Sequence, residues 1–357
     1  MAFQNSQEIY LSKQNEGYFM KGALMKTLMV IFVSLVLFFA NAPSYGASLY
    51  EGKTITIIVG YKPGGGYDRY ARLIAKYLPK YIPGNPGAIV QNMPGASSVI
   101  AANHLFSVAK PDGLTIGTFN NATVIAQLIK VEGVRFDLTK FAWLGSAASD
   151  AVILTIRSDL PYRTADDLRK AKQFVIGTTG PGSSTHDFPA ILAEFGGFDF
   201  KLVPGYSSSA DVMLAVERKE VDGRAGSYDS IKPFIDRGLV RPIIRNRTSA
   251  PGIEKLPVDE NLATSQQGKL IMAVNAVPTQ IYRPYVAPPA TSKDALKILR
   301  DGFANVLKDK ELLAEAEKGK MTIDYVSPEN ALKVVSEVLG QPPDVVKALA
   351  KHIKFGE

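Results

Sequence analysis

The sequence predicts an α/β protein of two domains, and three observations lead to this prediction. Short β-branched runs alternate with helical patterns along most of the chain, as in βαβ units built around a mostly parallel sheet. The length of 357 residues corresponds to about two domains at roughly 150 residues each. In addition, three loops rich in glycine or hydroxyl residues each join a strand-like run to a helical one.

The first of these strand–loop–helix units spans residues 54–82. Its loop, residues 62–68, reads Lys-Pro-Gly-Gly-Gly-Tyr-Asp and follows the β-branched run at 55–59. Glycines at a helix start let backbone amides approach a ligand, and the helix N-terminus adds partial positive charge. The loop lacks both the Gly-Lys-Ser/Thr ending of a phosphate loop and the Gly-x-Gly-x-x-Gly dinucleotide fingerprint. The unit is therefore either a site for a small anion or a flexible turn.

Two further loops repeat this pattern. Residues 91–98 lie between a strand-like run at 88–90 and a helical run at 99–108, and residues 177–186 lie between runs at 174–176 and 187–195. In open α/β sheets, ligands bind beyond the carboxyl ends of the strands. Neutral donors with few charges favour reversible recognition of a carboxylate over chemistry on it. We therefore expect all three loops to face one cleft.

Five motifs occur in a fixed order between about residue 53 and residue 340. They are Pro63-Gly64-Gly65 with Asp68, Ala71 and Arg72; Asn92 with Pro94-Gly95-Ala96; the run 109–115; the run 180–186; and the run 286–291 before a long helix. In this ordered set the chain resembles the substrate-binding proteins of tripartite tricarboxylate transporters, the periplasmic Bug or TctC-like family.

The resemblance implies a type II periplasmic binding-protein fold, with two α/β domains and a ligand cleft between them. A protein of this kind captures a small organic acid and passes it to a membrane permease of one small and one large subunit. The resemblance thus implies a monomeric periplasmic receptor that is not an enzyme and needs no cofactor. An extracytoplasmic receptor for a two-component sensor is the alternative, because either partner would touch the rim of the same clamp.

The expected ligand-binding residues come from the three loops, one aromatic residue further along and one arginine. They are Gly64, Gly65, Gly66, Tyr67, Asn92, Gly95, Ala96, Ser97, Gly180, Gly182, Ser183, Ser184, Thr185, His186, Tyr206 and Arg224. Tyr67 and the pair Ser97-Ser98 depart from the small or glycine-rich residues usual in the family, so the acid is not defined. Tyr67, Phe119, Tyr206 and Tyr228 either line a pocket for a flat acid or belong to the core.

Arg224 is the sharpest departure from the family pattern. It stands in Val221-Asp222-Gly223-Arg224-Ala225-Gly226, where an apolar strand is usual. An arginine there needs a partner, since an unpaired buried charge is costly. That partner is either a ligand carboxylate or a protein carboxylate such as Asp222 or Asp229.

Catalysis and metal binding have little support in the sequence. Ser183, Ser184, His186 and Asp187 are neighbours in the chain, whereas the members of a catalytic triad normally come from separate loops, and no Gly-x-Ser-x-Gly elbow is present. Helix capping explains the hydroxyls better, and a hydrolase is a remote alternative. The chain has no cysteine and three dispersed histidines, so we predict no metal site. Asp68 and Arg72, one turn apart, either pair within a helix or support the anion loop.

The N-terminal 47 residues are interpreted as an upstream extension and a secretory signal peptide. Lys21 and Lys26 precede a largely apolar run at 28–40, and small residues follow. Cleavage is expected near residues 46–48 or after Ala42, Met25 is a candidate start, and an uncleaved anchor is the alternative. The formal charge is +7, but the basic residues are dispersed and no nucleic-acid motif occurs, so we expect no nucleic-acid partner.

The expected domains are discontinuous. Residues 48–148 and 282–357 form the first and residues 149–281 the second. A long apolar stretch at 141–157 is interpreted as a strand crossing into the second domain, and the return is expected near 282–288. Late helices after Ser292, after Ser327-Pro328 and after Pro342-Pro343 should pack on the first domain.

Overall fold

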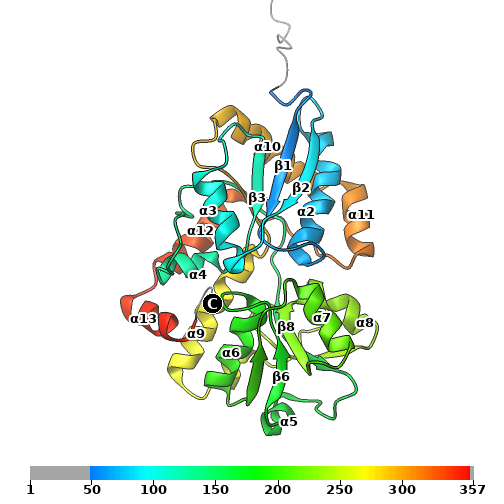
Figure 1. Cartoon of the computed structure of the whole chain (residues 1–357), viewed down its shortest axis with the longest axis vertical. Helices are drawn as coiled ribbons and strands as arrows, with labels where there is room; N and C mark the ends of the chain where they lie inside the picture. Colours follow the sequence, from blue (N-terminus) through cyan, green and yellow to red (C-terminus); the bar gives the residue numbers. More distant parts are fainter. Residues whose placement is uncertain (1–48, 354–357) are drawn as a thin grey trace, which may run out of the picture. The chain divides into compact units, whose positions relative to one another are not determined.

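The computed structural model describes residues 49–353, and the predicted signal peptide lies outside the described residues. From Leu49 onward the chain forms one compact unit containing two five-stranded sheets, each flanked by helices (Figure 1). The architecture is therefore α/β, as the alternation of strand and helix patterns predicts. Among the described residues, no helix is long and apolar enough to cross a membrane.

The first sheet has the strand order β2-β1-β3-β10-β4. β1 pairs in parallel with both β2 and β3, whereas β10 runs antiparallel to β3 and β4. A strand from late in the chain therefore lies inside the sheet that the first part of the chain builds. The bounds are β1 (Thr54–Val59), β2 (Gly87–Asn92), β3 (Thr115–Thr118), β4 (Ala142–Ser146) and β10 (Pro284–Ala287).

The second sheet has the order β7-β6-β8-β5-β9. β6 is parallel to β7 and β8, and β5 is antiparallel to β8 and β9. Glycine at position 223 of β8 lets β5 approach, since a Cβ there would lie 2.3 Å from the backbone oxygen of Thr155. The bounds are β5 (Val152–Arg157), β6 (Phe174–Gly177), β7 (Phe200–Val203), β8 (Gly223–Ser227) and β9 (Val240–Arg245).

Helices alternate with most of these strands, and after β10 the last helices, α10 to α13, follow one another with no named strand between them. The helices are α2 (Gly66–Tyr77), α3 (Val99–Ser107), α4 (Thr123–Leu128), α5 (Ala165–Lys170), α6 (Ser184–Gly196), α7 (Ser209–Glu217), α8 (Tyr228–Asp236), α9 (Gln266–Ala276), α10 (Lys293–Val306), α11 (Lys310–Lys318), α12 (Pro328–Leu339) and α13 (Pro343–His352). Short 3₁₀ turns lie at η1 (Leu78–Tyr81), η2 (Ala96–Ser98), η3 (Asp259–Leu262) and η4 (Val277–Ile281).

The stretch at 141–157 is not one crossing strand but two strands in different sheets. β4 ends at Ser146 and β5 begins at Val152. Between them, the amide of Ala147 donates to the carbonyl of Arg283 and the amide of Asp150 donates to that of Thr279. These hydrogen bonds join the segment between β4 and β5 to the segment that returns to the first sheet before β10. The chain therefore leaves the strand pairing of the first sheet before it joins the second sheet.

The predicted helix ends near the C-terminus are confirmed. Ser327 caps α12 by accepting a hydrogen bond from the amide of Asn330, Pro328 is the first helical residue, and Gly340 follows the last. α10 contacts β4, α11 contacts α2 and α12 contacts β4, whereas α13 contacts α9. The last helix therefore packs on a segment from residues 149–281. The domain boundaries themselves stay a prediction.

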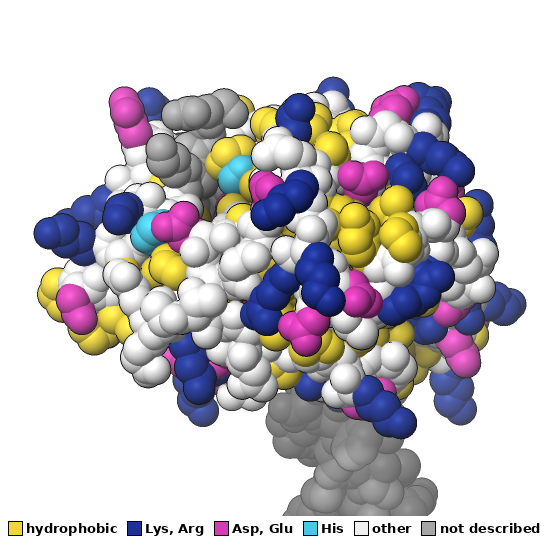
Figure 2. All heavy atoms as spheres, turned by 90° about the horizontal axis from the view of Figure 1, so that it is seen from below, with side chains coloured by type: hydrophobic (Ala, Val, Ile, Leu, Met, Phe, Trp, Pro, Cys, Tyr) yellow, Lys and Arg dark blue, Asp and Glu magenta, His cyan; other side chains and the backbone are white. Residues whose placement is uncertain are grey.

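The surface charge is mixed in the view from below. Figure 2 shows Lys and Arg side chains interspersed with Asp and Glu on that face, with apolar side chains between them. This distribution agrees with the dispersed basic residues of the sequence and gives that face no continuous field of one sign.

Candidate ligand-binding cavity

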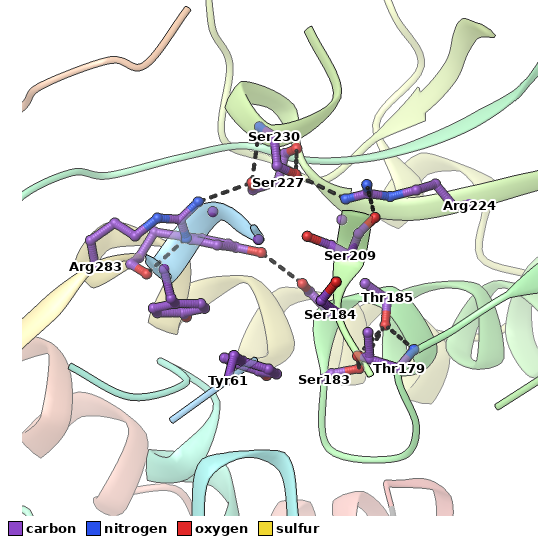
Figure 3. Close-up of a pocket in the computed structure, with 16 residues that line it drawn as sticks. Tyr61, Thr179, Ser183, Ser184, Thr185, Ser209, Arg224, Ser227, Ser230 and Arg283 are labelled. Carbon is purple, nitrogen blue, oxygen red and sulfur yellow. Dashed lines mark hydrogen bonds between the residues drawn. The ribbon is translucent and has the colours of Figure 1, made fainter. Parts of the chain in front are cut away.

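Residues at the starts of four helices line one cavity, and its lining side chains are drawn in Figure 3. The starts of α2, α6, α7 and α8 each follow a strand of one of the two sheets, so the cavity lies beyond the carboxyl ends of the strands. About 50 Å³ is open to the centres of water molecules, several times the roughly 10–15 Å³ that one water needs. The lining residues are Tyr61, Gly65, Gly66, Tyr67, Thr179, Ser183, Ser184, Thr185, Ser208, Ser209, Arg224, Gly226, Ser227, Ser230, Tyr282 and Arg283.

The helix starts give the cavity partial positive charge. α2 and α6 follow Gly65 and Ser183, and neither residue caps its helix with a side-chain hydrogen bond. α7 and α8 are capped by the hydroxyls of Ser208 and Ser227. The open first turns of α2 and α6 therefore offer amide donors to an anion, and all four helix dipoles add to that attraction.

Arg224 lies in β8 with only 1% of its surface exposed. Its Nη1 donates to the carbonyl oxygen of Ser209 at 2.8 Å, its Nη2 to Oγ of Ser230 at 2.8 Å, and its Nε to its neighbour's carbonyl oxygen at 3.3 Å. No carboxylate of the described residues lies within 4.0 Å of this guanidinium, so neither Asp222 nor Asp229 is its partner. A guanidinium has five N–H donors, so two remain for another acceptor.

Burial lowers the pKa of Arg224 to about 10, with a smaller opposing effect of Tyr282. The guanidinium therefore remains charged at neutral pH. Gly226 keeps the space beside it open, since a Cβ at that position would lie 2.9 Å from Nη2 of Arg224. Position 226 in β8 therefore has to hold a small residue if the side chain of Arg224 is to reach the cavity.

Arg283 is a second buried cation, and we did not predict it from the sequence. It is 2% exposed and its Nε has no hydrogen-bond partner among the described residues. The guanidinium carbon lies 4.7 Å from the ring centroid of Tyr67 and 4.5 Å from that of Tyr282. A Cβ at Gly66 would lie 2.7 Å from its Nη2. The available signal was the same as for Arg224: a lone arginine beside an apolar strand, here β10.

Two serines at the start of α8 connect the two arginines. Nη2 of Arg283 donates to Oγ of Ser227 at 3.1 Å, and the amide of Ser230 donates to the same oxygen. The Oγ of Ser230 accepts from Arg224, so the two guanidiniums approach the helix start from opposite sides in Figure 3. Two cations and a helix N-terminus thus face the same small volume, which favours an anion there.

The carboxyl group of Asp150 also lies beside Arg283. Oδ2 of Asp150 lies 3.8 Å from Nη2 of Arg283, and this oxygen has no hydrogen-bond partner among the described residues. Burial and the nearby Asp229 raise the pKa of Asp150, while Arg283 opposes the shift. Asp229 itself accepts from the hydroxyl of Tyr70 at 2.6 Å and from the amide of Thr322 at 2.7 Å, so it is occupied outside the cavity.

Hydroxyls and aromatic rings form the remaining walls. Oγ1 of Thr179 lies 2.9 Å from Oγ of Ser183 and 2.8 Å from Oγ1 of Thr185, and Oγ of Ser184 lies 2.6 Å from the hydroxyl of Tyr282. The ring of Tyr67 stacks between two other tyrosines, with centroids 5.2 Å from Tyr61 and 6.3 Å from Tyr282. Such walls suit the neutral part of a small organic molecule.

The structure brings part of the predicted set together. Gly65, Gly66, Tyr67, Ser183, Ser184, Thr185 and Arg224 line the cavity. Gly64 lines a neighbouring cavity instead, and Asn92, Gly95, Ala96, Ser97, Gly180, Gly182, His186 and Tyr206 line neither. Of the other aromatic candidates, Phe119 and Tyr228 are buried in core clusters.

Several of the residues outside the cavity wall hold its loops in place. The side-chain Nδ2 of Asn92 donates to Oδ1 of Asp68 at 2.9 Å and to the carbonyl oxygen of Tyr61 at 2.8 Å. Asp68 also pairs with Arg72 at 2.9 Å and accepts from the amide of Gly64 at 2.9 Å. Both interpretations of Asp68 therefore hold, because it makes the intrahelical ion pair and fixes the glycine loop.

The loops before α3 and before α4 both contact the loop before α6. Oγ of Ser97 donates to the carbonyl of Pro181 at 2.6 Å, and Nδ2 of Asn120 donates to the carbonyl of Gly182 at 2.6 Å. Ala96, Ser97 and Ser98 have φ values of 43°, 48° and 80°, which L-residues rarely adopt. Glycine would meet this requirement without strain.

The structure offers little support for chemistry at this site. Nδ1 of His186 lies 3.1 Å from Oδ1 of Asp187, and no hydrogen bond between this imidazole and a serine hydroxyl is present in the described part of the chain. Within residues 49–353, no group of three or more histidine or acidic side chains is placed to hold a metal ion. The charged and hydroxyl side chains that line the cavity can hold a ligand by charge and hydrogen bonds.

The fold is that of the periplasmic binding proteins. The periplasmic binding protein BugD superposes with a TM-score of 0.70 at 19% identity, over 85% of this chain and 100% of that protein. MatC from Rhodopseudomonas palustris, solved with bound malate, gives 0.67 at 19% identity, over 82% and 99%. The R. palustris protein Rpa4515, solved with adipate, gives 0.68 at 18% identity, over 88% and 100%.

The chain belongs to the TctC family, the tripartite tricarboxylate transporter family receptors, whose family model matches residues 71–350. It is also 25% identical over 200 residues to the UPF0065 protein in the tcbD-tcbE intergenic region of a Pseudomonas species, strain P51. That match covers 54% of this chain and 58% of the Pseudomonas protein, less than two thirds of its length.

Proposed function

We propose that this protein is a periplasmic receptor that captures a small organic acid by its carboxylate and delivers it to a tripartite tricarboxylate-type permease. Family membership and the predicted signal peptide support the location and the partner. Malate and adipate in two structural neighbours are both carboxylic acids, which supports the ligand class.

One observation carries the proposal: the guanidinium of Arg224 is buried in the cavity wall with no carboxylate of the described residues within 4.0 Å. An uncompensated buried charge is costly, and a ligand carboxylate would remove that cost. The two remaining N–H donors suit a bidentate contact. Amides at the starts of α2 and α6 and the hydroxyls around them supply the neutral hydrogen bonds.

We also propose that the clamp closes between a domain of residues 48–148 plus 282–357 and a domain of residues 149–281. The position of β10 within the first sheet and the grouping of β5 to β9 in the second support these boundaries. A ligand in the cavity would then touch both domains, since its walls include residues that follow strands of each sheet.

The test is to measure binding of mono-, di- and aromatic carboxylates by calorimetry, after a thermal-shift screen. A ligand at 100 times its dissociation constant adds about 2.7 kcal/mol to stability, which such a screen detects. Arg224→Met should weaken carboxylate binding about ten- to a hundredfold, the value of a charge-assisted hydrogen bond. The protein should stay folded, because a buried cation is replaced by an apolar side chain of similar volume.

Arg157→Met is the matched control. Arg157 lies at the end of β5, the strand paired with β8, and contacts Asp159 at 3.0 Å and Asp222 at 3.4 Å outside the cavity. The control should bind as the wild type does. Unchanged affinity in Arg224→Met, or failure of the wild-type protein to bind any carboxylate, would contradict the proposal.

A further inference from the structure

Residues of α6, η3 and α9 line a separate cavity, which we call the Asp259 cavity after one of its lining residues. About 20 Å³ of it is open to the centres of water molecules, and one water needs roughly 10–15 Å³. The cavity therefore has room for a single ion or water. Of the residues that line it and the first cavity, only Ser184 is shared, so the Asp259 cavity has walls of its own.

The lining of the Asp259 cavity is acidic. Two of its side chains, Asp187 in α6 and Asp259 in η3, are carboxylates, and α6 contacts η3 directly. Its other polar side chains are amides and hydroxyls, and no Lys, Arg or His is among its lining residues. The first cavity has the opposite character, because two arginines line it. The electrostatics of the Asp259 cavity thus favour a cation.

Asp259 has a carboxylate oxygen without a partner. Its side chain is 2% exposed, and its Oδ1 accepts a hydrogen bond from the amide of Glu260 at 2.9 Å. Within residues 49–353, its Oδ2 has no hydrogen-bond or ion-pair partner. Burial raises the pKa of Asp259 to about 7, although the amide of Glu260 and the charges of Arg247 and Arg245 oppose the shift. A cation in the cavity would offset the cost of burying this charge.

Asp187 repeats this arrangement on the opposite element. It is 4% exposed, and its Oδ1 accepts from the amide of Gly182 at 3.0 Å and lies 3.1 Å from Nδ1 of His186. Its Oδ2 has no hydrogen-bond or ion-pair partner in the described part of the chain. Each of the two buried carboxylates that line the cavity therefore keeps one oxygen for a ligand.

Neutral oxygens complete the wall, on Asn246, Asn275 and Thr279 among others. The side chain of Asn275 makes no hydrogen bond with the described residues, and Oδ1 of Asn246 accepts only from the amide of Val152, at 3.1 Å. Carboxylates mixed with amide and hydroxyl oxygens are the ligands of Ca²⁺, which takes about six to eight of them. Mg²⁺ keeps several waters, for which the cavity has no room.

We propose that the Asp259 cavity is a calcium site, with Asp187 and Asp259 as its charged ligands. Two carboxylates balance the charge of one divalent ion, and the amide and hydroxyl oxygens supply neutral ligands. Two aspartates do not make a zinc site, which would need more imidazole, thiolate or carboxylate ligands. This agrees with the lack, in residues 49–353, of any group of three histidine or acidic side chains.

The test is a calorimetric titration of the protein with CaCl₂, together with thermal unfolding in CaCl₂, MgCl₂ and NaCl at equal ionic strength. The protein is first freed of metal on a chelating resin, so that no carboxylate chelator enters the first cavity. We expect one Ca²⁺ to bind per chain. CaCl₂ should then raise the unfolding temperature by several degrees more than either other salt does.

Two variants test the proposed ligands. Asp259→Asn should weaken calcium binding about tenfold or more, because one charged ligand is lost. Without calcium it should be at least as stable as the wild type, since an unpartnered buried charge is removed. Asp187→Asn should weaken calcium binding as well, and its amide oxygen can still accept from Gly182.

Asp309→Asn is the matched control. Asp309 is similarly buried, at 7% exposed, but it accepts from the amides of Glu311 and Leu312 at the start of α11 and lines neither cavity. This variant should bind calcium as the wild type does. Absence of calcium binding by the wild type, wild-type affinity in either Asp187→Asn or Asp259→Asn, or equal stabilisation by MgCl₂ or NaCl would overturn the calcium site. None of these measurements uses an organic acid, so they leave the proposed receptor function to its own test.

Discussion

Arg224 and Arg283 depend on glycines that leave room for their guanidiniums. A Cβ added at Gly226 would lie within 3 Å of the Arg224 guanidinium, and a Cβ added at Gly66 would lie within 3 Å of the Arg283 guanidinium. Arg224 was predictable, because a charge in an otherwise apolar strand flanked by glycines needs a reason. Arg283 was not predicted, because Tyr282-Arg283-Pro284 was interpreted only as the connection that returns to the first sheet. Local sequence does not say which buried cation faces a cavity.

Gly226→Ala should lower carboxylate affinity about tenfold or more, because its methyl group would displace the Nη2 of Arg224 from the cavity. It should also cost about 1–3 kcal/mol of stability, since Gly226 has φ +146°. Gly238→Ala is the control: that glycine has φ +72° but no atom within 4 Å of an added Cβ. The Gly238→Ala control should lose stability but keep its affinity for carboxylates. Equal affinities of the two variants, measured by calorimetry, would show that the space beside Arg224 is not needed for binding.

Asp68→Asn should remove a pH dependence of stability. Burial alone would raise the pKa of Asp68, but hydrogen bonds from Arg72, Gly64 and Asn92 outweigh it and lower the pKa below 3.8. A lowered pKa means that the carboxylate stabilises the fold at pH values above 3.8 and that this stability is lost as the pH falls further. The difference between wild type and variant should be about 1–3 kcal/mol near neutral pH and shrink towards pH 3.

Urea unfolding at pH 7 and pH 3 measures that difference. Asp301→Asn provides the control, because Asp301 forms an exposed pair with Lys297 four residues away on α10 and should contribute little at either pH. A difference for Asp68→Asn that stays constant from pH 7 to pH 3 would argue that the carboxylate charge is not what holds the glycine loop.

At the scale of elements, helix starts dominate the site. The starts of α2 and α6 were predictable, because glycine and hydroxyl residues follow recognisable strands there. The starts of α7 and α8 contribute Ser208, Ser209, Ser227 and Ser230, which no sequence pattern singled out. Their serines look like ordinary helix caps, and only the pairing of β7, β6 and β8 in one sheet brings those caps to the same edge.

Ala96→Gly should raise stability slightly, by about 0.5 kcal/mol. Ala96 begins a run of three non-glycine residues with positive φ, and relief of about 1–2 kcal/mol is partly offset by the added flexibility of glycine in the unfolded chain. Thermal unfolding measures the change. Ala101→Gly, inside α3 of the same loop–helix unit, should instead destabilise the protein. A loss of stability in Ala96→Gly comparable to that control would contradict the strain argument.

At the scale of the whole molecule, contacts outside the cavity join segments of the two sheets. The hydroxyl of Tyr70 in α2 lies 2.6 Å from Oδ2 of Asp229 in α8, and Ser97 reaches Pro181. The sequence predicted two α/β units and a late strand returning to the first. It did not predict these bonds, nor that α13 contacts α9, because such pairings depend on how finished elements dock.

Tyr70→Phe should weaken the binding of every ligand by the same factor, about three- to tenfold. Tyr70 does not line the first cavity, and phenylalanine keeps the ring that contacts the Arg283 guanidinium. The loss should therefore act on the population of the closed clamp that we propose and not on ligand contacts. Tyr81→Phe removes a similar bond, 2.8 Å long, to Asp309, between two segments on the side of the first sheet, and should leave affinity unchanged. Calorimetry with chemically different acids measures both. Losses that vary widely from one acid to another would place the effect of Tyr70 in the site itself.

The two guanidiniums beside the start of α8 have a practical consequence for every binding measurement. Arg224 and Arg283 are joined through Ser227 and Ser230, and Arg224 has no carboxylate partner among the described residues. Such a place attracts small inorganic anions as well as organic acids. Dissociation constants measured in phosphate, sulfate or citrate solutions would therefore be apparent values, raised because the buffer anion competes with the acid for the site. The same titration in two buffers that differ only in their anion gives two apparent constants, and their ratio measures how strongly the salt competes with the acid.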